Sequence, residues 1–378
     1  MDTYKSAFRE AWSPLTAGAL VGFINTMMFA YESPWTVFTG LRNWGLHILE
    51  FLGIGDVAQI SPFEHQSSVM DIGFLLGAFG AALAAREFAI RIPPLREAIK
   101  GIIGGALMGI GANLSRGCTI GGFYSSIASM SVSGLWMMVG LFVGVVIGLK
   151  YLVWEKKGGG GASGGGYMLQ VPPVVQVPAG FIVIAAGMIG IPYYYNHLEF
   201  EGLAVLFGFT AALGIINQRA RFCVVRAIRD PFMTGDGEMT RGVIMAFAVA
   251  ITGFAILKHA EIREVMDHIN PSAGWPALVG GILFGIGMTL AGGCASGSLW
   301  RAGEGHVKLM LAVLSFAIFA AGTHLFLQLV VEYSYHHRVF LPDVTGNWAL
   351  AVLILFGVLA LWHFVISWNE KTEKLVIV

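Results

Sequence analysis

The sequence predicts an all-α integral membrane protein of about ten transmembrane helices in two matching halves. Three observations carry this prediction: a low charged content, apolar runs along the whole chain, and an internal repeat. Of the 378 residues, 56% are hydrophobic and 12% are charged, whereas soluble domains carry roughly 25% charged residues. The mean hydropathy is +0.71. So little polar surface cannot cover a water-exposed globule, and lipid is the expected solvent. The net charge is zero, which gives no basic face for nucleic acid.

Ten apolar segments are candidate membrane spans. Several are shorter than the roughly 20 residues that a full crossing needs. Two of these, 101–114 and 276–291, run directly into Gly-Cys, and each is followed by another short apolar stretch, 119–130 and 295–302. This pattern predicts helices that are broken at membrane depth. The predicted spans cover residues 14–30, 71–87, 101–114, 133–153, 179–195, 200–216, 241–258, 276–291, 307–331 and 347–367.

A glycine-rich segment divides the chain. Residues 158–166 are almost entirely glycine, which is typical of a flexible linker. The sequence thus predicts an N-terminal membrane half (1–157), a Gly/Pro-rich cytoplasmic linker (158–176) and a C-terminal membrane half (177–370). In the first half, aromatic and aliphatic residues at helical spacing predict an interfacial helix over 34–54 that lies on the bilayer.

Basic residues predict the orientation. The positive clusters are Lys5/Arg9, Arg86/Arg91/Arg96/Lys100, Lys150/Lys156/Lys157, Arg219 to Arg241, and Lys371/Lys374. Placing all of them in the cytoplasm agrees with the positive-inside rule, with ten crossings and with both termini inside. No Asp or Glu stands in the middle of a predicted span as a clear proton carrier, which leaves facilitated diffusion open.

The chain repeats itself at an offset of 176 residues, the separation between Cys118 and Cys294. Within the 18-residue window 104–121, ten residues are identical to their counterparts without a gap. The charge-based orientation makes the two copies cross the membrane in opposite directions. The expected arrangement is an inverted repeat whose half-helices meet near the membrane centre.

The two Gly-Cys breaks are the strongest candidates for a functional site. A broken helix leaves unpaired amides and a partial positive charge at the start of the next half-helix. Lipid does not tolerate these open amides, and a small anion is their preferred guest. One membrane cysteine is ordinarily packing material, but two at equivalent repeat positions favour a functional role. The expected path residues are Gly117, Cys118, Thr119, Gly121, Gly293, Cys294, Ser296 and Gly297.

Four further residues join this predicted path: Arg221, Cys223, Arg301 and Glu304. Cys223 lies in a basic segment, where Arg221 would make its thiol more acidic and more reactive, although the arginines also fit an ordinary cytoplasmic loop. Arg301 and Glu304 follow the second Gly-Cys. Their spacing fits a simple ion pair at a helix end, and their closeness to Cys294 fits a gate or an anion-guiding role.

The sequence predicts no cofactor, no metal site and no catalytic residue. The cysteines form no C-x-x-C motif, and the histidines, His336-His337 included, show no metal-ligand spacing. No acid–base pair flanks Cys118 or Cys294, which argues against an enzyme.

Arg116, two residues before Cys118, is a further candidate for guiding an anion.

Three segments resemble the YeeE/YedE sulfur-transport family. They are LSRGCTIGG at 114–122, QRARFC at 218–223 and AGGCASG at 291–297, and the likeness is greatest to the YedE branch, which is linked to selenium metabolism. The resemblance implies uptake of thiosulfate or a related inorganic sulfur compound across a bacterial inner membrane. It implies that Cys118, Cys223 and Cys294 pass the ion along by S–H to sulfur hydrogen bonds. A TusA-like cytoplasmic sulfur carrier is the implied partner.

The predicted function is therefore transport of a small sulfur-containing anion, thiosulfate in first place, along a cysteine-lined central path. Three alternatives stay open at this point. The cargo is a selenium compound, the protein is a membrane thiol enzyme such as a sulfurtransferase, or it is a purely structural membrane scaffold.

Overall fold

A computed structural model describes residues 8, 10–54, 60–158, 166–197, 201–329 and 337–377. Lys5, Arg9, His336 and most of the predicted glycine linker (159–165) lie outside these residues. Ten of the described helices are long and apolar enough to cross a membrane, and the one described sheet has two short strands. The predicted fold class, an all-α integral membrane protein, is confirmed.

The first part of the chain leads from an apolar helix to the first Gly-Cys break. Its elements are α2 (Pro14–Tyr31), α3 (Phe38–Phe51), α4 (Gln66–Ala84), β1 (Ala89–Ile92), α5 (Leu95–Leu114), η2 (Thr119–Tyr124), α6 (Ser125–Ala128) and α7 (Val132–Lys157). The helix α5 begins directly after Pro94, because proline disfavours a helical residue before it but is tolerated at a helix start. The helix ends before Arg116, whose φ of 54° is left-handed.

The second part of the chain contains the matching break. Its elements are β2 (Tyr167–Gln170), α8 (Pro173–His197), α9 (Glu201–Ala220), α10 (Val224–Met233), α11 (Glu238–His259), α12 (Trp275–Ala291), α13 (Ala295–Gly303), α14 (Val307–Leu329), α15 (Leu341–Thr345) and α16 (Trp348–Thr372). The helix α12 ends at Gly292, whose φ of 85° is left-handed, as glycine allows at a helix end. Both predicted helix breaks are therefore present.

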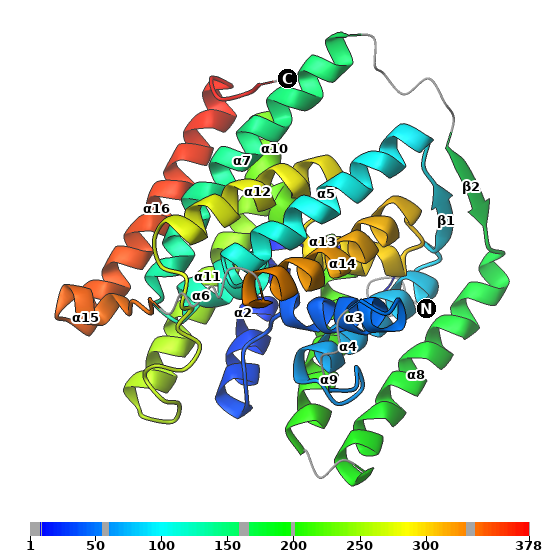
Figure 1. Ribbon diagram of the computed structural model, residues 1–378, viewed down its shortest axis with the longest axis horizontal. Helices are drawn as coiled ribbons and strands as arrows, with labels where there is room; N and C mark the ends of the chain where they lie inside the picture. The colour runs from blue at the N-terminus through cyan, green and yellow to red at the C-terminus, as the bar shows by residue number, and fades with distance from the viewer. Residues whose placement is uncertain are drawn as a thin grey trace.

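Glycines hold α5 and α12 together in the middle of the molecule (Figure 1). A Cβ on Gly104 would lie 2.5 Å from the carbonyl oxygen of Gly287, and one on Gly111 would lie 2.5 Å from that of Gly280. The two helices therefore run antiparallel with their backbones in contact, as small residues permit between membrane helices. The repeat offset exchanges these two pairs, since it matches Gly104 to Gly280 and Gly111 to Gly287.

The packing pairs of the neighbouring helices are related to each other in the same manner. The helix α5 also packs against α14, and α12 also packs against α7; likewise α4 packs against α9, and α2 packs against α11. The helices α8 and α16 lie on opposite edges of the molecule (Figure 1). The first packs against α4, and the second packs against α11.

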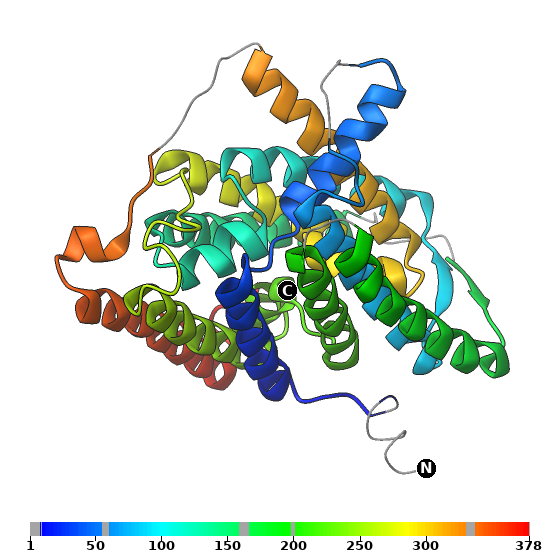
Figure 2. The same ribbon diagram turned by 90° about the horizontal axis from the view of Figure 1, so that it is seen from below.

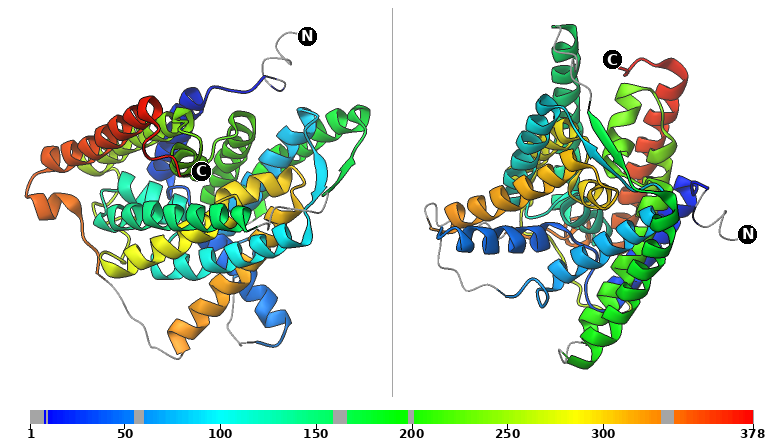
Figure 3. Two further views of the ribbon diagram at one scale, coloured as in Figure 1. Left: turned by 90° about the horizontal axis from the view of Figure 1, so that it is seen from above. Right: turned by 90° about the vertical axis from the view of Figure 1, so that its right-hand side faces the viewer.

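The structure shows what forms in two ranges that the sequence identified: the predicted interfacial helix and the predicted linker. The interfacial segment forms the helix α3, which packs against α14 and α4 and projects with α14 from one side of the molecule (Figures 2 and 3). Its position on a bilayer stays a prediction. Within the range taken as linker, β2 pairs antiparallel with β1, with Ala89 opposite Gln170, and α8 already begins at Pro173.

One helix boundary corrects the interpretation of charge. The span expected over 71–87 is the helix α4, which begins at Gln66, so Asp71 lies inside it rather than at its edge. The side chain of Asp71 is completely buried. The sequence predicts no Asp or Glu in the middle of a span. Asp71 stands in the second turn of α4 rather than at its middle, and the polar Gln66, Ser67 and Ser68 before it are the reason that the predicted span begins only at residue 71.

Candidate functional site

Each Gly-Cys break places a cysteine directly before the next half-helix. Cys118 is the N-cap residue of η2, and its Sγ accepts a hydrogen bond from the amide of Ile120 at 3.4 Å. Cys294 is the N-cap residue of α13, and its Sγ accepts one from the amide of Gly297 at 3.4 Å. A thiol sulfur is only a weak acceptor. The first amides of both half-helices are thus held by weak partners rather than left open.

The structure brings half of the predicted path residues into one group, here called the thiol cluster: Cys118, Thr119, Cys223, Cys294, Ser296 and Gly297. The sulfurs of Cys223 and Cys294 are in hydrogen-bond contact, and the Thr119 hydroxyl faces Cys294. The Ser296 Oγ lies 3.5 Å from Cys294 Sγ. All three cysteines are free and buried. Thr119 connects the first break with the second, because it directly follows Cys118 in the chain.

Gly297 is the position where two of the thiols converge. A Cβ built on it would lie 3.3 Å from Cys223 Sγ and 3.4 Å from Cys294 Sγ. Gly117 and Gly293 lie beneath the half-helices instead: Gly117 packs against Gly122, and Gly293 packs against Ser298. Glycine at these positions lets the chain return closely on itself, while glycine at 297 leaves room beside the sulfurs.

The position of Cys223 has a counterpart in the first part of the chain. Cys223 is the N-cap residue of α10, and Val37 is the N-cap residue of α3. Cys294 contacts the Cys223 thiol, and Cys118 contacts the backbone amide of Val37. The repeat offset instead matches Cys223 to His47, which lies within α3 and faces Glu50 at 3.5 Å. Packing therefore reveals an equivalence that the offset of 176 residues misses, because loop lengths differ before the two breaks.

A polar cavity of about 290 Å³, here called the vestibule, approaches the thiol cluster from one end. Thr36, Thr39, Ser67, Arg116 and Gly121 are among its lining residues. Gly121 also presents its backbone amide to the Cys118 sulfur. Cys118 therefore lies directly behind the vestibule wall, although its own side chain is completely buried.

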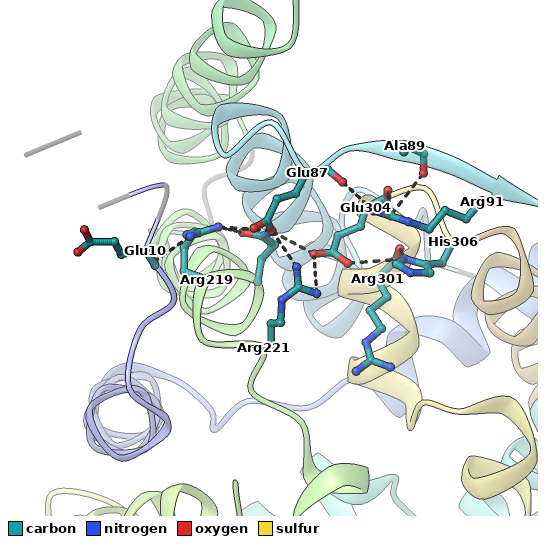
Figure 4. A network of polar contacts seen from close by, with 10 residues as sticks. Glu10, Glu87, Ala89, Arg91, Arg219, Arg221, Arg301, Glu304 and His306 are labelled. Carbon is teal, nitrogen blue, oxygen red and sulfur yellow. Dashed lines mark hydrogen bonds and ion pairs between the residues drawn. The ribbon is translucent and has the colours of Figure 1, made fainter. Parts of the chain in front are cut away.

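An arginine and glutamate network lies at the end of α13 that is opposite to Cys294 (Figure 4). Arg221 lies 3.1 Å from Glu87 and 3.9 Å from Glu304. Gln218 donates to the same two carboxylates, at 2.7 and 3.0 Å. Arg219 faces Glu87 at 3.5 Å. The network and the vestibule lie at opposite ends of α4, about 28 Å apart along its 19 residues.

The structure separates Arg301 from Glu304, so the expected ion pair is wrong. Arg301 donates to the carbonyl oxygen of Gly292 at 3.0 Å, where it caps the end of α12. Glu304 turns toward Gln218 and Arg221 and is 1% exposed. Burial raises the pKa of Glu304. Burial and neighbouring arginines lower the pKa of His306 to about 4, so at neutral pH its contact with Glu304 is not an ion pair.

Sequence reasoning missed several polar residues around the cluster. Glu87 follows Arg86 in a stretch interpreted only as a basic loop, and Gln218 was noted only for its motif. The neighbourhood of Cys223 also differs from expectation. Its sulfur lies near Arg226, Arg229 and Arg301, while Arg221 is engaged by the two glutamates. Glu87 and Glu304 belong to no sequence motif. They come together only because four separate segments of the chain pack against one another.

Comparison with known proteins agrees with this arrangement. The family model described as "Sulphur transport" matches residues 1–147 and 219–377. The chain belongs to the sulphur transport family. The matched residues include all three cysteines, both breaks and the arginine network except Gln218.

Two kinds of curated relatives of this family member are known. The "Probable transporter YedE" of Escherichia coli (strain K12) is 29% identical over 320 residues, which cover 78% of this chain and 77% of the relative. The "Thiosulfate transporter TsuA" of the same strain is 33% identical over 111 residues, which cover 29% of this chain and 31% of the relative. TsuA of Spirochaeta thermophila is 34% identical over 110 residues, or 29% of this chain. The family and these relatives agree with a multi-pass membrane transporter.

Proposed function

We propose that this protein carries a small sulfur oxyanion, thiosulfate in first place, across the membrane through the thiol cluster. The observation that carries this proposal is the pair of half-helices whose first amides are held only by the sulfurs of Cys118 and Cys294. The name of TsuA, a relative over part of the chain, supports thiosulfate as the cargo.

The chemistry of the cluster suits a doubly charged anion. Removing such an ion from water is costly unless donors replace its hydration. An arriving oxyanion is a stronger acceptor than a thiol sulfur, so it displaces Cys118 or Cys294 from the amides of Ile120 and Gly297. The freed thiol then donates its S–H to the anion. Thr119 adds a buried hydroxyl that has no N or O partner in the described chain.

Passage runs from the vestibule to the arginine network in this proposal. Arg116 lines the vestibule and attracts the anion there. The anion then passes from Cys118 to the neighbouring pair Cys294 and Cys223. Several weak sites in series allow release as well as entry. Glu87, Arg221 and Glu304 form the gate at the far end.

The basic residues of the network support a cytoplasmic location for that end, in agreement with the positive-inside rule. Arg219, Arg221, Arg226 and Arg229 lie at or near it on α9 and α10. Both termini are then cytoplasmic, and the membrane is a bacterial inner membrane. A TusA-like sulfur carrier would receive the cargo at this face.

The reciprocal packing of helices supports an inverted repeat. We assign α2 to α8 to one copy and α9 to α16 to the other, because each packing pair in the first set has a counterpart in the second. The boundary then lies near residues 198–200, with α8 in the first copy, rather than at the glycine linker. The thiol cluster lies where the two copies meet.

Uptake of labelled thiosulfate by cells that lack other importers tests the proposal. Cys118→Ala and Cys294→Ala should each lower uptake at least tenfold, because each change removes both a donor and a cap. Cys223→Ala should lower it less, since Cys223 caps no amide with its side chain. Protein amounts in the membrane, compared by immunoblot, provide the control. Full uptake in all three variants contradicts a thiol path.

A further inference from the structure

The carboxyl group of Asp71 is sealed within a helix long and apolar enough to span a membrane. Asp71 lies in the second turn of α4, and its side chain is completely buried. Neither of its carboxyl oxygens has a hydrogen-bond partner in the described chain. Intramembrane carboxyl groups are rare and costly, and those that occur usually carry ions or protons. Neither the thiol path nor the arginine network uses this group.

No cation balances a negative charge on Asp71. In the described residues no Lys, Arg or His forms an ion pair with it; the described ion pairs are the twelve found at other sites. Of the charged groups on the helices packed against α4, Arg42 of α3 turns toward His324 at 3.5 Å. Arg219 of α9 and Arg301 and Glu304 of α13 lie at the far end, in or beside the arginine network. The titratable group that faces Asp71 is the thiol of Cys118.

The surroundings suit the neutral acid instead. The Asp71 side chain lies against Gly40 of α3, and a Cβ on Gly40 would meet both Asp71 Oδ2 and the carbonyl oxygen of Ser67. A protonated carboxyl group can donate to such a carbonyl oxygen, whereas a carboxylate is repelled by it. The Leu41 amide, which faces the Asp71 carboxyl group, also donates to the carbonyl oxygen of Val37 at 3.2 Å.

Asp71 also stands between the vestibule and the first thiol. Ser67, one helical turn before it, lines the vestibule together with Thr39, and the Thr39 hydroxyl donates to the Ser67 hydroxyl at 2.6 Å. These two hydroxyls extend from the vestibule to within one helical turn of Asp71. On its other side Asp71 is in electrostatic contact with Cys118. A proton on Asp71 and an anion at Cys118 therefore influence each other directly.

We propose that Asp71 is a proton-binding site that couples anion transport to inward proton movement. An anion at Cys118 and a carboxylate at Asp71 would repel each other across a dry interior, so anion binding requires the protonated acid. By linkage the anion then also favours proton binding. Entry of an anion into a cell that is negative inside is opposed by the membrane potential, and the accompanying proton offsets one of its charges.

This inference rests on the proposed function, and the experiment separates the two. The purified full-length protein is placed in liposomes with the membrane potential clamped at zero, and labelled thiosulfate is offered on both sides. The outer solution is then made one pH unit more acidic than the inside. If one proton accompanies each anion, this gradient should raise thiosulfate accumulation up to about tenfold, since a pH unit is a tenfold change in proton activity. Asp71→Asn should abolish this rise, and Asp71→Glu should retain it.

Two further measurements complete the test. The matched control is Asp343→Asn, which changes an exposed residue of α15. This variant should keep the full response to pH. Infrared spectroscopy should show a protonated carboxyl band in the unmodified protein that is lost in Asp71→Asn, with or without transport.

The outcomes distinguish the two proposals. Thiosulfate exchange without any response to the pH step overturns the proton coupling and leaves the transport function standing. Absence of thiosulfate exchange in the unmodified protein overturns the transport function. In that case the infrared band decides on the proton site. A carboxyl band that is unchanged by Asp71→Asn overturns the proton site, and loss of the band supports the proton site.

Discussion

At the scale of single residues, the main feature is the use of cysteine as a helix cap. Ser, Thr, Asp and Asn are the usual N-cap residues because their oxygens bind the first amides well. Cys118 and Cys294 occupy this position with sulfurs, at 3.4 Å from their amides. Weak caps leave the amides available to a better acceptor. In the proposed transport path, this use of sulfur in place of oxygen lets the anion exchange with the cap.

Gly297→Ala tests the room beside the thiols. The new Cβ would lie 3.3 and 3.4 Å from the sulfurs of Cys223 and Cys294, which narrows the cluster without adding charge. We expect thiosulfate uptake to fall at least fivefold. Alanine is a better helix former than glycine by up to about 1 kcal/mol, so the melting temperature in detergent should not fall.

Gly357→Ala in α16 is the matched control, because nothing lies within 4 Å of a Cβ there. This variant should keep full uptake. Unchanged uptake in Gly297→Ala would mean that the cargo does not pass between these two sulfurs.

At the scale of elements, the half-helix α13 connects the thiol cluster with the arginine network. The half-helix α13 begins at Cys294 and ends at the network, where Glu304 is its C-cap residue. The same short helix therefore contacts the thiols with its first residues and the gate with its last. The paired strands β1 and β2 lie beside it, since Ala89 and Arg91 donate their amides to the carbonyl oxygens of Glu304 and Gly305.

Glu304→Gln tests the gate. The change removes the charge that faces Arg221 at 3.9 Å and keeps a side chain that can bind Gln218. Since a partly exposed ion pair contributes up to about 1 kcal/mol, we expect roughly fivefold faster alkylation of Cys223 by a maleimide added to inside-out vesicles. Mass spectrometry of the labelled peptide measures this rate.

The pH dependence of alkylation has a defined sign. Burial raises the pKa of Glu304, so it gains a proton at a higher pH than an ordinary glutamate as the pH falls. Relative to the intrinsic thiol reaction, Cys223 in the unmodified protein should become more accessible as the pH falls, and Glu304→Gln should remove that change. Glu97→Gln, which removes a pair with Lys308 at 2.6 Å, is the control. Equal rates in all three proteins would exclude Glu304 from the gate.

At the scale of the whole molecule, the crossing of α5 and α12 holds the two proposed copies together. Gly104→Ala and Gly111→Ala each place a methyl group 2.5 Å from a carbonyl oxygen of α12. Overpacking of this kind costs about 1–3 kcal/mol, so both variants should melt at a clearly lower temperature in detergent. Gly322→Ala in α14, which has open space around its Cβ, should melt like the unmodified protein. Equal melting of all three variants would contradict a tight glycine crossing.

The sequence by itself determined the membrane fold class, the two helix breaks and the position of Cys118 and Cys294 at these breaks. These features follow from local composition and from a repeat without gaps, so no knowledge of distant contacts is required. It also indicated Arg221 and Glu304, although not that they face each other. The Arg301–Glu304 pair suggested by their spacing is absent, because Arg301 instead satisfies the open carbonyl oxygen of Gly292 at 3.0 Å.

Only the tertiary structure decided which residues meet. It placed Cys223 against Cys294, joined Glu87 and Gln218 to the gate, and enclosed Asp71 without a partner. None of these contacts has a signal in the sequence, because each joins segments that are far apart in the chain and carry no common motif. Apolar periodicity predicts where a helix is, but the polar partners of a buried residue depend on how the helices cross.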